Sequence, residues 1–243
     1  MTTAQATAEE YASRLELTLP RLLERVDRAA EAAGRPPSAV RLVAVTKAHP
    51  LEAVDAALAA GLRDLGENRA EELEEKVAAR PETPVRWHMI GHVQGRKARR
   101  VAELADLIHS VDSLRLAQRL SRFSVEMGRE VEVLAQVNTS GESSKSGFDL
   151  AEASDAVIAV AELPGLRVRG LMTMAPFVDD ERVLAGAFAR LRELGERLRG
   201  LSDRVGPELS MGMSNDLDVA IREGSTMLRI GTALFGERPG GPA

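Results

Sequence analysis

The sequence contains no cysteine, which excludes disulfide bonds, thiolate nucleophiles and cysteine-ligated metals. Its four histidines form no His-Glu-x-x-His motif, so no metal site is expected. Aromatic residues make up only 3% of the chain. No apolar run approaches the roughly 20 residues that span a bilayer, and the N-terminus lacks the basic start and apolar stretch of a secretory signal. We therefore expect a cytoplasmic protein that has no membrane partner.

An excess of positive charge is also absent. The 32 lysines and arginines are outnumbered by 37 aspartates and glutamates, which gives a net charge of -5 at pH 7. Such a chain has no global basic field to attract nucleic acid or anionic lipid, so no nucleic-acid partner is expected. The local basic cluster in residues 96–100 is most simply a solvated helix face. No hydrophobic surplus demands association, and we expect a monomer.

The periodicity of the apolar residues predicts an α/β fold. Residues 7–33 form one amphipathic helix, stopped by Gly34, Pro36 and Pro37. Helical patterns then alternate with eight apolar runs, at residues 41–46, 62–66, 85–91, 107–112, 130–138, 166–174, 208–213 and 226–231. The second run is weak because Asp64 interrupts it. Eight strand–helix units favour a closed parallel barrel. We predict a single (β/α)8 TIM barrel, at about 41–236, with an extra N-terminal helix, in one domain over residues 1–243.

Lys47 stands where the first predicted strand must turn. The active sites of such barrels lie at the carboxyl ends of the strands. A lysine there can simply extend from the strand end to solvent, which is the commoner case for a lysine considered alone. It can also be a Schiff-base lysine, whose partial desolvation favours the neutral amine that attacks an aldehyde. The residue by itself does not decide between these two interpretations.

The last two predicted strands favour the second interpretation. A loop with Ser210, Gly212 and Ser214 follows the seventh strand, and Gly231 and Thr232 follow the eighth. Barrels often bind phosphate with these two loops, although each loop alone would pass for an ordinary turn. The eighth strand closes beside the first, which places this site next to Lys47. A lysine beside a phosphate site suggests pyridoxal 5′-phosphate (PLP).

Arg229 precedes the last loop by two residues and is placed to reach the pyridine nitrogen of such a cofactor. Arginine does not readily accept a proton, so it would favour an unprotonated ring and a weaker electron sink than an aspartate would. A salt bridge inside the barrel mouth is the alternative role for Arg229.

Several motifs together resemble the pyridoxal phosphate homeostasis protein family. They are AVTK (44–47), GEN (66–68), WHMIGHVQGRK (87–97), SKSG (144–147), RGLMTM (169–174), SMGMSNDL (210–217) and STMLRIGTALFG (225–236). The resemblance covers nearly the whole chain and implies a barrel similar to the N-terminal domain of alanine racemase. It implies that Lys47 carries the Schiff base, that Asn68 lies beside the cofactor and that Arg229 faces its ring. Ser210, Ser214, Gly231 and Thr232 would then bind the phosphate.

The chain departs from the family pattern at two places. The family usually has Gln-Ser/Thr-Asn-Lys where this chain has Gln94, Gly95, Arg96 and Lys97. An aromatic residue commonly follows the GEN motif, and here Arg69 does. Any role of that asparagine or aromatic residue is therefore not carried over to this chain.

The residues also favour a carrier over a catalyst. Racemases of this fold use a tyrosine opposite the lysine, and the one tyrosine here, Tyr11, belongs to the N-terminal helix. The barrel uses the whole length, so no second domain remains to cover the cofactor. We expect a non-catalytic protein of intracellular PLP homeostasis, with PLP and, transiently, PLP-dependent apoenzymes as partners. The alternatives are a PLP-dependent amino-acid racemase or lyase, a cofactor-free Schiff-base aldolase and a purely structural interaction protein.

Overall fold

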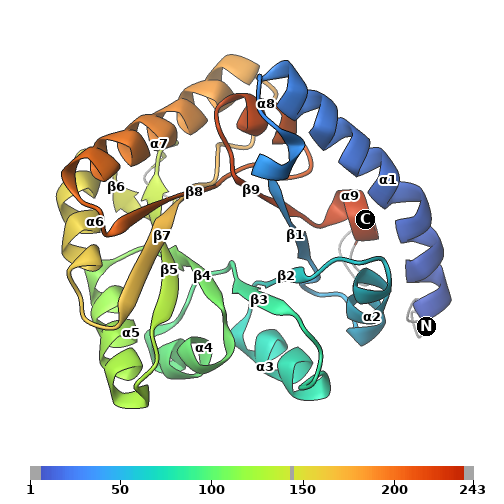
Figure 1. Cartoon of the computed structure of the whole chain (residues 1–243), viewed down its shortest axis with the longest axis horizontal. Helices are drawn as coiled ribbons and strands as arrows, with labels where there is room; N and C mark the ends of the chain where they lie inside the picture. The colour runs from blue at the N-terminus through green and yellow to red at the C-terminus, as the bar shows by residue number, and fades with distance from the viewer. Residues whose placement is uncertain (1–6, 143–144, 238–243) are drawn as a thin grey trace.

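The strands of the protein form a closed parallel barrel. The computed structural model describes residues 7–142 and 145–237. The barrel strands are β1 (Arg41–Val45), β2 (Asp64–Glu67), β3 (Arg86–Met89), β4 (Leu107–Val111), β5 (Val131–Asn138), β7 (Leu166–Met172), β8 (Val205–Ser210) and β9 (Met227–Ile230). Each pairs in parallel with its neighbours, and the β1–β9 and β4–β5 pairings complete the ring in Figure 1. The predicted (β/α)8 barrel is confirmed.

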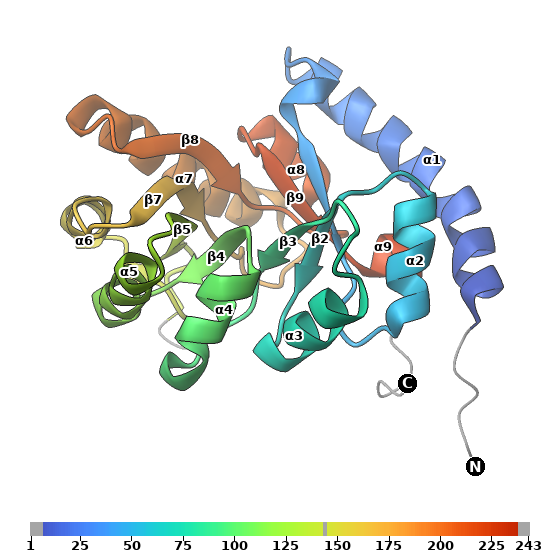
Figure 2. The same cartoon turned by 60° about the horizontal axis from the view of Figure 1, so that its bottom comes forward.

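Helices surround this ring. They are α2 (Leu51–Ala59), α3 (Ala70–Ala79), α4 (Ala98–Leu104), α5 (Leu114–Met127), α6 (Ala153–Ala161), α7 (Glu181–Leu201), α8 (Leu217–Arg222) and α9 (Thr232–Phe235), with short 3-10 turns at Pro37–Ala39 and Gly95–Lys97. The additional helix α1 (Ala8–Ala32) lies outside the ring against α2, α8 and α9, as Figure 2 shows for α2. Thr7 and Glu10 form a capping box at its start. Its buried stripe includes the predicted apolar positions Leu15, Leu19, Leu22, Val26 and Ala30.

The charge of Asp64 suggested that it interrupts the second strand. In the structure Asp64 is instead the first residue of that strand. Its side chain is about four-fifths buried and its Oδ1 lies 2.9 Å from Nε2 of His88, on the neighbouring strand β3. A charged residue is therefore tolerated in this strand because a buried polar partner meets it. The weakness of the apolar run came from an interior polar position and not from a break in the strand.

Strand β8 begins at Val205, three residues before the predicted start, although it contains Pro207. The register between β7 and β8 shifts between Val168 and Gly170, and such an irregularity accommodates a residue that cannot donate to the ladder. Gly170 is required there, because its φ is +148° and a Cβ atom would lie 2.0 Å from the carbonyl oxygen of Glu208.

A further short strand, β6 (Phe148–Asp149), follows the polar loop after β5 and pairs with the end of that strand. Two residues are too few to produce a periodic pattern, so this strand was not predicted from the sequence. Ser143 and Ser144 of the same loop, the second of which begins the SKSG motif, lie outside the described residues.

The apolar interior has two parts. A large cluster fills the space between the barrel and its helices. A small second cluster has one member from each of five barrel strands: Val43, Leu107, Leu134, Met172 and Met227. Polar side chains share the inside of the barrel with this second cluster, and they matter for the site below.

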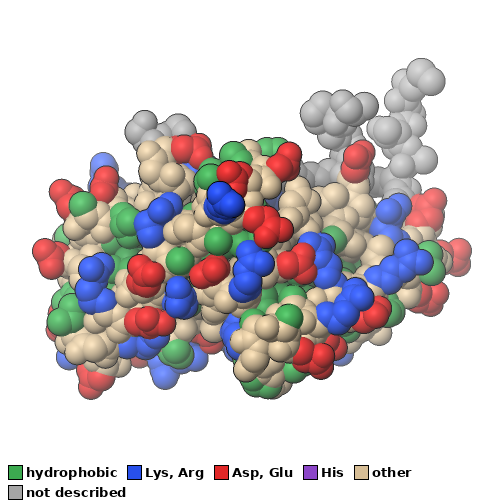
Figure 3. Space-filling model, turned by 90° about the horizontal axis from the view of Figure 1, so that it is seen from above, with side chains coloured by type: hydrophobic (Ala, Val, Ile, Leu, Met, Phe, Trp, Pro, Cys, Tyr) green, Lys and Arg blue, Asp and Glu red, His purple; other side chains and the backbone are tan. Residues whose placement is uncertain are grey.

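The surface carries both signs of charge. Lysine and arginine side chains are interspersed with aspartate and glutamate over the face shown in Figure 3. In the part of the chain that the structure describes, no helix is long and apolar enough to cross a membrane.

Candidate functional site

All the predicted site residues lie near the carboxyl ends of four neighbouring strands or just after them. Lys47 follows β1, Asn68 follows β2, and the remaining candidates end or follow β8 and β9. These strands stand side by side in the order β2, β1, β9, β8. The fold therefore gathers residues from opposite ends of the chain at one part of the barrel mouth.

Lys47 stands in a tight turn. Thr46, just before it, is fully buried, and Lys47 itself is half-buried. Ala48 adopts a left-handed conformation with φ +59°, which is unfavourable for a residue with a side chain. Its N–H donates to Oε2 of Glu72, on α3, over 2.9 Å. The turn thus fixes the backbone next to Lys47, and sequence reasoning did not identify Glu72 as its partner.

A buried carboxylate supports this turn from below. Oε1 of Glu67 accepts hydrogen bonds from Oγ1 of Thr46 over 2.5 Å and from Nζ of Lys76 over 2.7 Å. Nζ of Lys76 also donates to the carbonyl oxygen of Thr46 over 2.8 Å. Burial raises the pKa of Glu67 to about 7, although Lys76 acts in the opposite direction. Sequence reasoning missed this pair, because a lysine on a helix with several charged residues gives no sign of burial.

The loop after β8 is held in shape by its own groups. Gly212 has φ +95°, and a Cβ atom there would lie 2.5 Å from Cβ of Ala220. The N–H of Met213 donates to Oδ1 of Asp216 over 2.6 Å. Oγ of Ser214 accepts from the N–H of Ala233 over 3.3 Å, which ties this loop to the start of α9. The two loops predicted to form one site are therefore in contact.

The second of these loops also contacts the strand that leads to Lys47. Ala44 of β1 pairs with Ile230 of β9, and a Cβ atom on Gly231 would lie 3.3 Å from the carbonyl oxygen of Val45. Thr232, which follows, is exposed at the mouth. The predicted proximity of Lys47 to the Gly231–Thr232 loop is thus present in the backbone.

Three aromatic side chains reinforce this contact from outside. Oη of Tyr11 lies 2.9 Å from Nδ1 of His49, and the two rings meet edge to face. Both rings also contact Phe235 of α9, with centroid distances of 6.4 Å from Tyr11 and 5.5 Å from His49. Tyr11 lies on α1, as predicted, but its contact with the turn after Lys47 could not be predicted from any local pattern.

Arg229 lies deep in the mouth and is 5% exposed. Its Nη1 donates to Oγ of Ser210 over 2.7 Å and its Nη2 to the carbonyl oxygen of Thr173 over 3.0 Å. Burial lowers the pKa of Arg229 to about 10, with the charge of Asp216 opposing this shift, so the guanidinium stays protonated at neutral pH. Arg229 and Ser210 are brought together directly, whereas Asn68 is exposed at the rim.

The residues that depart from the family pattern are Gly95, Arg96 and Arg69, and the structure shows what each one contacts or where it lies. A Cβ atom at Gly95 would lie 2.5 Å from Nη1 of Arg119, so that arginine side chain occupies the space of a serine or threonine side chain. Nε of Arg96 donates to Oε1 of Gln94 over 3.0 Å. Arg69 is exposed and precedes α3.

Comparison with known protein families and relatives shows which proteins this chain resembles. A family model described as alanine racemase, N-terminal domain, matches residues 17–239. A pyridoxal phosphate homeostasis protein from Pseudomonas aeruginosa is 46% identical over 95% of this chain and 99% of its own length. One from Escherichia coli is 42% identical over 90% of this chain and 95% of its own length.

Solved structures give the same result. PipY of Synechococcus elongatus, in a crystal structure with PLP bound, is 37% identical, with a TM-score of 0.77 over 87% of this chain and 100% of PipY. An unknown protein from Bifidobacterium adolescentis is 37% identical, with a TM-score of 0.89 over 96% of this chain and 99% of its own. Alanine racemase of Clostridium difficile is 16% identical, with a TM-score of 0.75, and covers 91% of this chain. That last likeness shows the fold alone.

Proposed function

This chain belongs to the pyridoxal phosphate homeostasis protein family, and from that membership we propose that it binds PLP as a Schiff base on Lys47 and acts in intracellular PLP homeostasis. The observation that carries the proposal is the meeting of three elements at one mouth. Lys47 follows β1 directly, the Gly231–Thr232 loop contacts the end of β1, and Arg229 lies buried beneath that loop.

The residues present fit the chemistry of this cofactor. A primary amine can bond to its aldehyde, and the protonated guanidinium of Arg229 can donate to a ring nitrogen that bears no proton. Gly212 and Gly231 have no side chains of their own to crowd the two loops, and Ser214 and Thr232 add hydroxyl groups to the same loops. Such groups bind a phosphate through charge-assisted hydrogen bonds.

The roles of the other candidates follow from their positions. Asn68, exposed at the end of β2 next to β1, would lie beside the ring. Ser210 is fully buried and bonded to Arg229, so we propose that it acts through that arginine. PipY with PLP bound supports the assignment of the cofactor.

We further propose that the protein is a non-catalytic monomeric carrier in the cytoplasm, which exchanges PLP transiently with apoenzymes. The specific support is Tyr11. It is 3% exposed, its hydroxyl contacts His49, and burial raises its pKa. A tyrosine held in this way is not placed to take a proton from a substrate at the mouth.

The test is chemical reduction of the purified protein. Incubation with PLP should give the visible absorbance of a Schiff base, and borohydride should remove it and leave a pyridoxyl group on the peptide that contains Lys47. Lys47→Ala should show no such absorbance. Modification of Lys97 or Lys145 with Lys47 unlabelled would refute the assignment.

Phosphate recognition is tested with a second ligand. The wild type should bind PLP much more tightly than unphosphorylated pyridoxal, because several charge-assisted hydrogen bonds of roughly 1.5–3 kcal/mol are lost without the phosphate. Gly231→Val should weaken PLP binding more than Thr232→Ala does. Gly231→Ala adds only one carbon, which would lie 3.3 Å from the carbonyl oxygen of Val45, so its effect should be smaller than that of valine. Equal affinity for PLP and pyridoxal would show that the loops do not bind phosphate.

A further inference from the structure

A chain of polar side chains crosses the inside of the barrel from its amino end to Arg229. Oδ1 of Asp64 lies 2.9 Å from Nε2 of His88, and Nδ1 of His88 lies 2.9 Å from Nε2 of His109. Nδ1 of His109 lies 2.8 Å from Oγ of Ser210, which accepts the hydrogen bond from Arg229. Asp64 begins β2 and the other members come from β3, β4, β8 and β9. Four hydrogen bonds thus link five strands.

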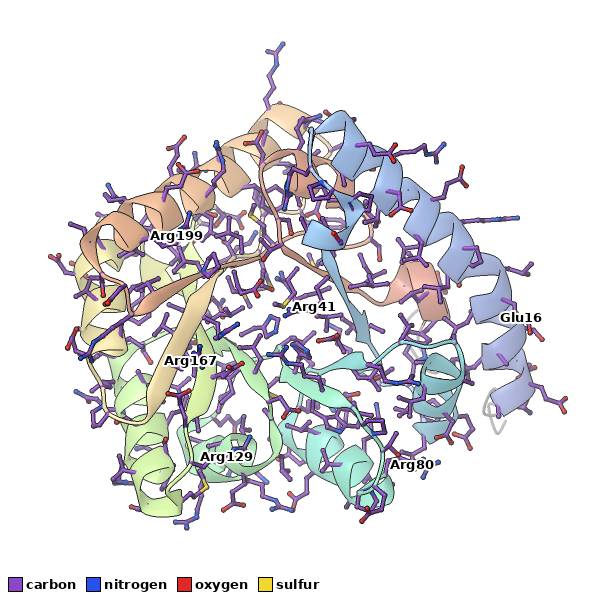
Figure 4. The ribbon with its side chains drawn as sticks, in the orientation of Figure 1. Glu16, Arg41, Arg80, Arg129, Arg167 and Arg199 are labelled. Carbon is purple, nitrogen blue, oxygen red and sulfur yellow. The ribbon has the colours of Figure 1, made fainter. Side chains whose placement is uncertain are left out.

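Asp64, the first member of this hydrogen-bonded series, interacts with nearby positive charges. Nε of Arg41 lies 4.0 Å from Oδ1 of Asp64, and Figure 4 shows Arg41 inside the ring of strands. Burial alone would raise the pKa of Asp64, but the hydrogen bond with His88 and the charges of Arg41 and Arg86 lower it overall. Asp64 is therefore a carboxylate at neutral pH and can only accept hydrogen bonds.

Both histidines are neutral at the same pH. Burial lowers the pKa of His88, with Asp64 opposing this effect. Burial lowers the pKa of His109 well below its usual value, and the positive charges of Arg229, Arg41 and Arg86 act in the same direction. A neutral imidazole has one nitrogen that donates and one that accepts.

These conditions leave one arrangement of protons. Because Asp64 accepts, Nε2 of His88 carries the proton and Nδ1 of His88 is bare. Nε2 of His109 must then donate to that bare nitrogen, which leaves Nδ1 of His109 bare in turn. The hydroxyl of Ser210 therefore donates to His109, and its oxygen keeps its lone pairs for Arg229. Each of the four hydrogen bonds then has one donor and one acceptor.

We infer that Asp64, His88, His109 and Ser210 are positioning residues, which hold Ser210 in one hydroxyl orientation and thereby fix the guanidinium of Arg229. In its last step, the contact of Arg229 with a ring nitrogen, the inference rests on the proposed function. It assigns Ser210 a different role from the one that the sequence suggested: its hydroxyl proton is used by His109 and is not offered to a phosphate.

The proton arrangement is measured on the protein without cofactor. Long-range hydrogen–nitrogen NMR correlations of protein labelled with 15N-histidine should show His88 and His109 each as a single tautomer, protonated on Nε2, at pH 7.5. A proton on Nδ1 of either ring, or a doubly protonated ring, would overturn the inference. The exposed His92 serves as an internal reference.

Replacement of Asp64 tests the direction in which the hydrogen bonds of this series are donated. An amide can donate as well as accept, so Asp64→Asn should produce a mixture of tautomers at His88 and His109. Glu132→Gln is the matched control, because Glu132 is a carboxylate of similar exposure, 25% against 22%, that pairs with Arg86 and lies outside the chain. A single unchanged tautomer in Asp64→Asn, or an equal change in Glu132→Gln, would contradict the proposed direction.

The last step is tested by comparing two ligands. Ser210→Ala removes one acceptor of the Arg229 guanidinium and should weaken PLP binding about tenfold, the lower end of what a charged hydrogen bond contributes. With an analogue whose ring nitrogen is replaced by carbon, the same variant should show little loss. Equal losses with both ligands would place Ser210 on the phosphate. If the tautomers are as expected but the wild type binds no PLP, the proposed hydrogen-bond arrangement is confirmed and the proposed function is wrong. If PLP binds but the tautomers differ, the proposed function is supported and the hydrogen-bond arrangement is wrong.

Discussion

At the scale of single residues, substitutions in the buried pair of Glu67 and Lys76 are expected to have a large effect on stability. The side chains of Glu67 and Lys76 are 0% and 7% exposed. A buried ion pair contributes little by itself, but removal of one member leaves a charge without compensation. The pair lies directly under Thr46, so it couples the stability of the protein to the turn that carries Lys47.

We predict that Lys76→Met lowers the free energy of unfolding by about 3–5 kcal/mol at pH 8. The loss should be smaller at pH 6. Without Lys76 the raised pKa of Glu67 rises further, and a group whose folded pKa is raised loses its contribution to stability as pH increases through that pKa. Urea unfolding at the two pH values measures this.

The double variant Glu67→Gln/Lys76→Met is the control, because it removes the carboxylate together with its partner. It should be more stable at pH 8 than Lys76→Met alone. If the two variants have the same stability at both pH values, the loss in Lys76→Met comes from packing and not from charge.

At the scale of elements, α1 is more than an outer cover for the barrel. Tyr11, near its start, contacts both His49 after β1 and Phe235 in α9. One side chain therefore connects the added helix to the two segments that flank the candidate site. Burial of an aromatic ring against two partners is a large contribution for a single residue.

Replacement of this ring should destabilise the protein in two distinguishable steps. Tyr11→Phe removes the hydrogen bond to His49 and should cost about 1 kcal/mol. Tyr11→Ala also removes the ring and should cost about 3–5 kcal/mol. Leu17→Ala, on the same helix but at a position that is 64% exposed, should change stability by less than about 0.5 kcal/mol. Denaturant titrations of the three variants give the comparison, and a loss in Leu17→Ala as large as that in Tyr11→Ala would contradict the specific role of the aromatic contact.

At the scale of the whole molecule, the neutral histidines inside the barrel set the response to acid. A histidine whose folded pKa is lowered binds fewer protons in the folded state than in the unfolded state. Its contribution to stability is complete above the unfolded pKa of about 6.5 and is lost as pH falls below it. His88 and His109 both behave in this way, facing Asp64, Arg41, Arg86 and Arg229.

We predict that the free energy of unfolding decreases below about pH 6.5, with a slope of up to about 1.4 kcal/mol per pH unit for each of the two histidines. Chemical unfolding between pH 5 and 7.5 measures it. His92→Gln should keep this slope, because His92 is 62% exposed and pairs with Asp112 at the surface. If the slope disappears in His92→Gln, the acid sensitivity arises from His92 and not from His88 and His109, and the prediction is wrong.

The sequence by itself determined the elements of this protein and the position of its lysine. The period of apolar residues identified the N-terminal helix and the eight barrel strands, because a buried face imposes that period locally. Lys47 and the two loops were found because barrel topology places strand ends at one mouth.

Only the tertiary structure decided which side chains meet. Partners in the hydrogen-bonded series from Asp64 to Arg229 are up to 101 positions apart, and closure of the barrel and the register of its strands bring them within hydrogen-bonding distance. The same holds for Lys76 beneath Thr46 and for Tyr11 against His49. A local pattern shows which face of an element is buried, but the residue that it faces there depends on the packing of segments far away in the chain.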